Sequence, residues 1–212
     1  MMALSEYRKR ETLPVLWVAV CSDILLIGIL TGLWELFDIL TPFIAPFLLM
    51  GAWGIFLTVL VYSLVHVFRK KRYKNTFSFF PLGAQLVAFV VILIVPFTSI
   101  MLNLDFKRNL QKREEVVLRV ISGELKPNVA HNVSLILLPD EQKHLSKGGG
   151  EIMVEHYNGE ASVFFFTFRG ILDNFSGFIY RSDDSVPNYN DFDGDFSEIK
   201  RIKENWYWVA SH

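Results

Sequence analysis

The chain has 212 residues, a formal net charge of −1 and a hydrophobic content of 51%. Residues 1–102 carry eight Lys/Arg and five Asp/Glu, whereas residues 103–212 carry thirteen Lys/Arg and seventeen Asp/Glu. A mildly acidic second half argues against nucleic-acid binding, which needs a basic surface. The one cysteine, Cys21, excludes a disulfide within the chain.

Three apolar segments, residues 13–34, 43–68 and 79–102, dominate the first half of the chain. Each is long enough to cross a bilayer as a helix, which takes about 20 residues. They predict an integral, multi-pass membrane protein with the lipid bilayer as its immediate partner. The first segment is too long for a cleavable signal peptide and has no small-residue cleavage site at its end, so we expect an uncleaved signal-anchor.

The basic residues that flank these segments predict the orientation, because positive residues beside membrane spans stay in the cytoplasm. Residues 1–12 contain three, and the connection between the first two segments contains none. The connection between the second and third segments contains five, Arg69, Lys70, Lys71, Arg72 and Lys74. We therefore expect a cytoplasmic N-terminus and an extracytoplasmic C-terminal domain in a plasma or inner membrane. Basic residues between positions 107 and 113 oppose this orientation.

The same basic cluster at residues 69–74 has a second interpretation. Clusters of Lys and Arg beside a membrane span can bind anionic lipid headgroups. Lipid contact and an orientation signal are compatible, so the cluster is assigned to topology and to headgroup binding together.

Asp23 lies near the middle of the first apolar segment. An ionised carboxylate at that depth costs at least about 2.5 kcal/mol unless it is paired or hydrated. None of the three segments contains a Lys or Arg that could pair with it. Three interpretations remain open: a proton or cation relay, a polar contact with another subunit, or a neutral acid satisfied by neighbouring helices.

Gly28 and Gly32 are one helical turn apart in the same segment. Small residues at this spacing allow two membrane helices to approach closely, so these glycines are candidate helix-packing positions. We expect a homo-oligomer or a membrane-protein partner.

Residues 103–212 are expected to form an α+β domain with an antiparallel sheet. Its first element is a helix that continues the third membrane segment and stops at Gly123. Asn158-Gly159 favours a two-residue hairpin between residues 151–157 and 160–169, with both faces of the sheet partly apolar. The five segments predicted to form strands are 132–138, 151–157, 160–169, 174–181 and 206–210.

Neither a catalytic nor a cofactor-binding motif stands out in this second half. Carboxylates gather near its end, at Asp191, Asp193, Asp195 and Glu198. Hard cations such as Ca²⁺ prefer several oxygen ligands on one turning loop, but the glycine is misplaced for an EF-hand. These four residues are therefore weak metal candidates, and a solvated acidic loop is the other interpretation.

The chain is therefore expected to be non-enzymatic and to need no cofactor. Its extracytoplasmic domain would bind a protein partner or a ligand in an assembly, accessory-sensor or immunity-type role. The alternative is a small oligomeric channel or transporter that uses Asp23. A membrane enzyme with a site built from Asp23, Glu35 or Asp38 ranks last.

Overall fold

The computed structural model describes residues 2–70, 76–130, 132–157, 160–170 and 174–211. The chain divides into two compact units, Met1–Met101 and Leu102–His212. The predicted fold class is confirmed, because long apolar helices fill the first unit and an antiparallel sheet with helices fills the second.

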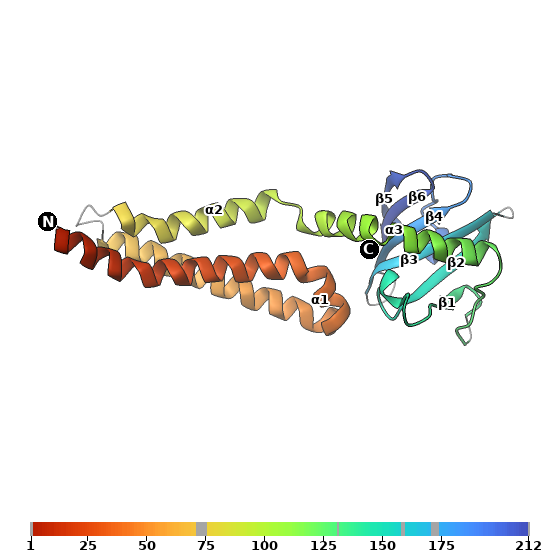
Figure 1. Ribbon diagram of the computed structural model, residues 1–212, viewed down its shortest axis with the longest axis horizontal. Helices are drawn as coiled ribbons and strands as arrows, with labels where there is room; N and C mark the ends of the chain where they lie inside the picture. The colour runs from red at the N-terminus through yellow and green to blue at the C-terminus, as the bar shows by residue number, and fades with distance from the viewer. Residues whose placement is uncertain (1, 71–75, 131, 158–159, 171–173, 212) are drawn as a thin grey trace. The chain divides into compact units, whose positions relative to one another are not determined.

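The first unit contains α1 (Met2–Lys70), a short 3-10 helix η2 (Thr76–Phe79) and α2 (Phe80–Ile94). The helix α1 doubles back on itself, so its two arms and α2 lie side by side (Figure 1). Three segments are long and apolar enough to cross a membrane, Glu11–Leu40, Phe43–Arg69 and Thr76–Ile94. These candidate spans support a membrane protein.

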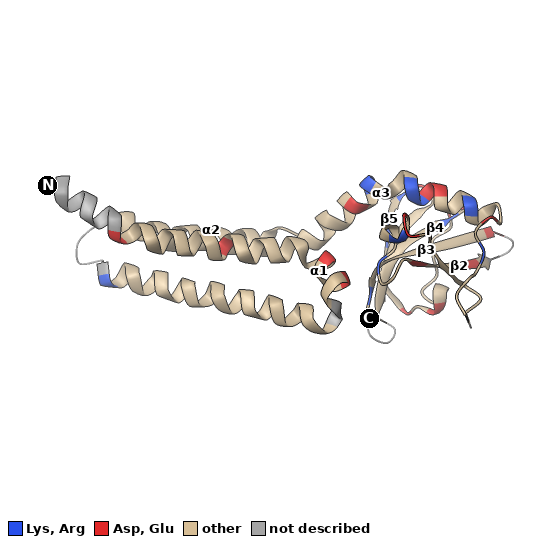
Figure 2. Ribbon diagram, turned by 60° about the horizontal axis from the view of Figure 1, so that its bottom comes forward, with Lys and Arg blue, Asp and Glu red and all other residues tan. Residues whose placement is uncertain are grey.

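A small apolar cluster holds the three segments together. It contains Leu26 from the first arm of α1, Ala52 and Phe56 from the second arm, and Ala88 from α2. Most of the other large apolar side chains in this unit are exposed, which suits a surface that faces lipid rather than water. Charged residues are scarce along these helices and frequent in the second unit (Figure 2).

The helix expected to run without interruption from the third span into the exposed domain is broken. The helix α2 ends at Ile94 and α3 (Phe97–Ile121) begins after Val95 and Pro96. Proline lacks the backbone N–H that would continue the helical hydrogen bonds, and its ring clashes with the preceding turn. The third apolar helix is therefore shorter than the expected segment 79–102.

The second unit is built on a six-stranded antiparallel sheet with the order β1-β2-β3-β4-β6-β5. Each strand pairs with its neighbours in the antiparallel sense. The strands are β1 (Leu135–Leu137), β2 (Glu151–Tyr157), β3 (Glu160–Arg169), β4 (Phe175–Arg181), β5 (Phe196–Lys203) and β6 (Trp206–Ser211).

The predicted hairpin of β2 and β3 is confirmed. Tyr157 pairs with Glu160 and Val154 pairs with Val163, as a two-residue turn requires. The turn residues themselves, Asn158 and Gly159, lie outside the described residues.

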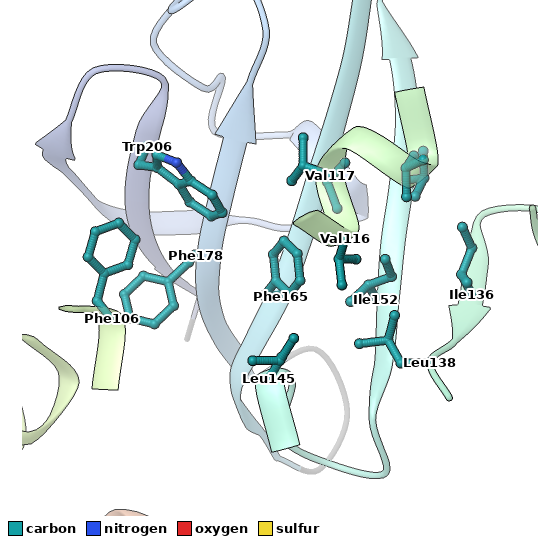
Figure 3. Packing of buried hydrophobic residues seen from close by; sticks show 13 residues of the cluster. Phe106, Val116, Val117, Ile136, Leu138, Leu145, Ile152, Phe165, Phe178 and Trp206 are labelled. Carbon is teal, nitrogen blue, oxygen red and sulfur yellow. The ribbon is translucent and has the colours of Figure 1, made fainter. Parts of the chain in front are cut away.

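Apolar side chains cover both faces of the sheet. On one face, α3 contributes Val116 and Val117, which pack with Phe165, Phe178 and Trp206 of the sheet (Figure 3). On the other face, a second cluster surrounds a different set of side chains, Leu135, Phe164, Phe166, Ile179, Phe192, Phe196 and Val209. The long segment between β4 and β5, which includes η4 (Asp191–Asp193), therefore serves as the second cover.

The strand β5 has no counterpart among the predicted strands. It pairs only with β6 and forms one edge of the sheet. Its residues include Glu198, Lys200, Arg201 and Lys203, which hide the apolar alternation of a half-buried strand. Charged side chains are common on edge strands because they discourage pairing with other chains.

Candidate functional site

A groove with a volume of about 310 Å³ lies on the second unit beside α3. Eight residues line it, Glu114, Val117, Leu118, Tyr180, Lys203, Glu204, Asn205 and Trp206. They come from α3, from the end of β4, and from the adjoining ends of β5 and β6 with the turn between them, which are far apart in sequence. Ligand pockets usually have volumes between about 300 and 1,000 Å³, so this groove fits one or two partner side chains or a small ligand.

The α3 wall of the groove follows from helical spacing. Glu114, Val117 and Leu118 are separated by three and four residues, so they lie on one side of the helix. Val117 is buried against the sheet, whereas the side chain of Leu118 is 65% exposed. An apolar side chain of this size in open solvent at the rim of a groove is available for contact with another molecule.

The opposite wall is the tight turn between β5 and β6. Asn205 adopts a left-handed backbone conformation with φ of +65°, which asparagine tolerates better than most residues. Its backbone N–H donates to Asp184 Oδ1 at 2.6 Å and its side chain donates to the carbonyl oxygen of Arg181 at 2.7 Å. This wall is therefore fixed to the segment that follows β4.

Aromatic rings form the floor. The Trp206 ring lies against Phe106 of α3, Phe165 of β3 and Tyr180 of β4, with centroid distances of 5.4, 5.9 and 5.4 Å. Trp206 is almost fully buried. Because neighbouring rings hold it in place, the floor is preorganised and does not need to be rebuilt on binding.

Charged groups stand at the rim. Lys203 Nζ donates to Glu114 Oε1 at 3.0 Å, which links β5 to α3 at the edge of the groove. Desolvation raises the pKa of the Tyr180 hydroxyl, and the nearby carboxylates of Glu114 and Glu160 add to the shift. The Tyr180 hydroxyl therefore stays protonated at neutral pH and can donate a hydrogen bond.

The lining residues combine apolar, aromatic and charged groups. The groove offers one exposed leucine, a phenol, a nearly buried indole, two carboxylates and one ammonium group. Its lining includes no serine, cysteine or histidine, whereas its phenol, ammonium and carboxylates are groups that can also transfer protons.

The acidic residues near the end of the chain have structural roles. Asp191 forms an ion pair with the buried Arg181 at 2.9 Å and accepts the backbone N–H of Asn188. Glu198 forms an ion pair with Lys200 at 2.5 Å on the edge strand.

The remaining two acidic candidates, Asp193 and Asp195, are exposed. Across the described residues, no three or more His, Cys, Asp or Glu side chains gather in a way that could hold a metal ion. The structure therefore does not bring the four weak metal candidates together.

In the first unit, Asp23 is buried inside the helical bundle and is only 7% exposed. Its neighbour Ser22 accepts a hydrogen bond from Gln85 Nε2 of α2 at 3.3 Å. Gln85 also donates to the carbonyl oxygen of Phe56, so it connects the three helical segments.

The other candidate residues of this unit face outward or lie outside the described residues. A Cβ atom added to Gly28 or Gly32 would meet no atom within 4 Å, so these glycines pack against no other helix of the same chain. Arg69 is exposed near the end of α1, where Lys70 is the last helical residue. The other members of the basic cluster, Lys71, Arg72 and Lys74, lie outside the described residues.

A comparison with known proteins finds no matching family model, no similar curated protein and no similar solved structure. The groove and the buried polar residues therefore have to be interpreted from their own chemistry.

Sequence reasoning missed the groove because three distant elements form it. Trp206 and Val117 are recognisable as apolar residues of regular elements, but such residues usually belong to a core. The best available signal was Leu118, an apolar residue next to the buried stripe of α3 rather than within it.

Proposed function

We propose that this protein is a membrane-anchored binding protein whose C-terminal domain captures a protein partner in the groove beside α3. The observation that carries the proposal is the exposed Leu118 above a rigid aromatic floor. Interfaces concentrate their binding energy where apolar or aromatic side chains fill a preformed pocket and exclude water. An assembly, accessory-sensor or immunity-type protein would need such a surface.

The charge of the groove favours a particular kind of partner segment. Two carboxylates, Glu114 and Glu204, and one ammonium group, Lys203, line the groove, Lys203 is paired with Glu114, and the region 103–212 carries an excess of acidic residues. A segment with an apolar side chain next to a Lys or Arg would match this pattern. Opposite charges across an interface accelerate association and suppress wrong partners.

We also propose that this domain lies on the extracytoplasmic side, with the N-terminus in the cytoplasm. The basic residues at positions 8–10 and 69–74 support that orientation. Among the basic residues that oppose it, Arg113 is 1% exposed and paired with Asp105 in the domain core. Arg113 is therefore a structural residue, and the opposing signal is weaker than the sequence suggests.

Photo-crosslinking in living cells of the source organism tests the binding surface. A photoreactive amino acid in place of Leu118 should capture one specific protein. The matched control carries the same amino acid in place of Val133, an exposed apolar residue that does not line the groove. Capture of the same proteins at both positions would show that the groove has no special role.

Cysteine labelling tests the orientation. The variant Val133→Cys in a Cys21→Ala background places a single thiol on the C-terminal domain. A membrane-impermeant maleimide should label it in intact cells. Labelling only after lysis would place the domain in the cytoplasm and contradict the proposed orientation.

A further inference from the structure

Buried polar side chains occupy one half of the helical bundle. They are Thr12, Ser22, Asp23, Ser63, Ser78 and Gln85, each at most 7% exposed, and the apolar side chains of Val15, Ala19 and Val67 are buried among them. The other half contains the apolar cluster around Phe56. Most buried polar atoms in proteins have hydrogen-bond partners, so a group of this kind inside an apolar bundle needs an explanation.

All of these polar residues lie toward the same end of the bundle. From Leu26 in the cluster, Ser22 lies one turn back along the first arm of α1. From Phe56, Ser63 lies two turns forward along the second arm, which runs in the opposite direction (Figure 1). Both steps lead to the end of the bundle where α1 ends, next to Arg69.

The polar residues of the third helical segment lie toward the same end of the bundle. Gln85 lies one turn before Ala88 of the cluster, and Ser78 lies two turns before Gln85. Gln85 Nε2 donates to Ser22 Oγ and to the carbonyl oxygen of Phe56, with distances of 3.3 and 3.5 Å. The first polar layer therefore joins all three helical segments directly above the apolar cluster.

Four oxygen atoms of this region are buried without a hydrogen-bond partner in the described structure: Asp23 Oδ1, Gln85 Oε1, Ser63 Oγ and Ser78 Oγ. The first two are oxygens that normally accept hydrogen bonds. No Lys or Arg lies between residues 11 and 68 or between residues 76 and 94. These segments thus supply buried oxygens and no Lys or Arg, and among the described residues the one other titratable side chain with a buried polar atom at this end is His66, through its Nε2.

The spacing of these oxygens favours water over a metal ion. Ser78 in η2 and Gln85 in α2 are seven positions apart, which corresponds to about 10 Å or slightly more along the helical axis. A hard cation needs about six oxygens around one point, whereas these oxygens are spread along a line. Waters make two to four hydrogen bonds each and can connect oxygens arranged in this way.

We propose that Asp23 is a proton-binding site that water reaches from the Arg69 end of the bundle. The Asp23 carboxylate takes a proton from a hydronium ion, which leaves as water, and the reverse step returns the proton along the same path. Leu26, Phe56 and Ala88 close the path on the other side, so exchange is one-sided in this conformation. This site is independent of the binding groove in the C-terminal domain.

Infrared spectroscopy of the full-length protein in lipid nanodiscs tests the proton and its access to water. As the pH is lowered from neutrality, the wild type should gain a protonated-carboxyl band that is missing in Asp23→Asn. Transfer to D₂O should shift that band within minutes. If the asparagine variant does not fold, Asp23→Glu assigns the band by moving it. Absence of the band, or a band that never exchanges, would overturn the proposal.

Thiol reactivity tests which half of the bundle is wet. In a Cys21→Ala background, Ser63→Cys should react with a small water-soluble thiol reagent roughly tenfold faster than Ala52→Cys, because thiol reactivity follows access and thiolate formation. Both positions are buried in the same arm of α1, so they are matched controls. Equal rates at the two positions would overturn the one-sided path.

Discussion

Arg113 is a fully buried arginine at the centre of the C-terminal domain. It donates to Asp105 Oδ2 at 2.6 Å and to the carbonyl oxygen of Leu145 from both Nε and Nη2. Its guanidinium group lies 4.8 Å from the centre of the Phe178 ring. Burial lowers the pKa of Arg113, and the neighbouring Asp105 opposes that shift. Because Arg113 and Asp105 both belong to α3, the hydrogen bonds to Leu145 and the contact with the Phe178 ring are what connect this helix to the rest of the domain.

The variant Arg113→Ala is expected to destabilise the domain by about 3–5 kcal/mol, because it leaves a partly buried carboxylate without its partner. Urea unfolding of the full-length protein in detergent, followed by limited proteolysis of the domain, measures this change. In the control Arg119→Ala, the lost ion pair with Glu124 is largely exposed and should cost less than about 1 kcal/mol. Similar losses in both variants would contradict the structural role of Arg113.

Glu155 provides a pH-dependent prediction. Desolvation raises its pKa, with smaller contributions from Asp191 and Asp193, although the backbone N–H of Phe192 opposes the shift. The folded domain therefore binds this proton more tightly than the unfolded chain does. Stability from this group is greatest below the unfolded pKa, about 4.3, and falls as the pH rises through the higher folded pKa.

Glu155→Gln removes this titration and keeps an oxygen that can accept the Phe192 N–H. The variant should therefore gain stability relative to the wild type as the pH rises from about 4 toward neutrality. Urea unfolding at several pH values measures the difference. Glu115→Gln, on the exposed side of α3, is the matched control because its carboxyl stays in water in both states. A wild-type advantage that grows with pH would contradict the prediction.

Among the strands, β4 depends on a close contact between its backbone at Gly177 and the side chains of β3. Gly177 pairs with Phe166 and Val209 at the centre of the sheet. A Cβ atom added there would lie 2.3 Å from the Phe164 ring and 2.5 Å from the carbonyl oxygen of Phe165. The backbone cannot move away without disturbing the neighbouring strand.

Gly177→Ala should therefore cost about 1–3 kcal/mol or more through overpacking. The same urea and proteolysis measurement applies. Gly83→Ala in α2 is the control, because an added Cβ there meets no atom within 4 Å. An unchanged unfolding midpoint for Gly177→Ala would show that β4 and β3 are packed less tightly than the structure indicates.

Some of these elements could be predicted from the sequence, whereas others could not. The hairpin of β2 and β3 was predictable in register because its turn and its alternation are local signals. The edge strand β5 could not be predicted in this way, because its many charged residues are typical of an exposed loop. In α3, Ile121 is 49% exposed whereas Arg113 is fully buried, so residue type alone does not identify the face of this helix that packs on the sheet.

The candidate sites were predictable only where one residue is unusual for its surroundings. Asp23 is the one carboxylic acid near the middle of its apolar segment, so the sequence alone made it a candidate. The groove was not, because its walls meet only when α3, β4 and β5 pack together. The ion pair between Asp191 and Arg181 was hidden for the same reason, and the acidic residues therefore resembled a cation site.

At the scale of the whole molecule, the two units differ in the surfaces that they present. The helical unit has a largely apolar surface and several buried polar side chains, and the C-terminal domain has a groove beside α3. Three helices are few for a pore made by one chain, whereas they are sufficient for an anchor. The central claim is therefore that the C-terminal domain binds a partner protein.

Affinity purification of the tagged full-length protein from native membranes in mild detergent, with a native mass measurement, tests this claim most directly. The account predicts a second protein in stoichiometric amount with the wild type and with Val133→Arg. The partner should be lost with Leu118→Arg, which places a charge over the aromatic floor of the groove. A wild type that purifies alone, or a partner that remains with Leu118→Arg, would contradict the account.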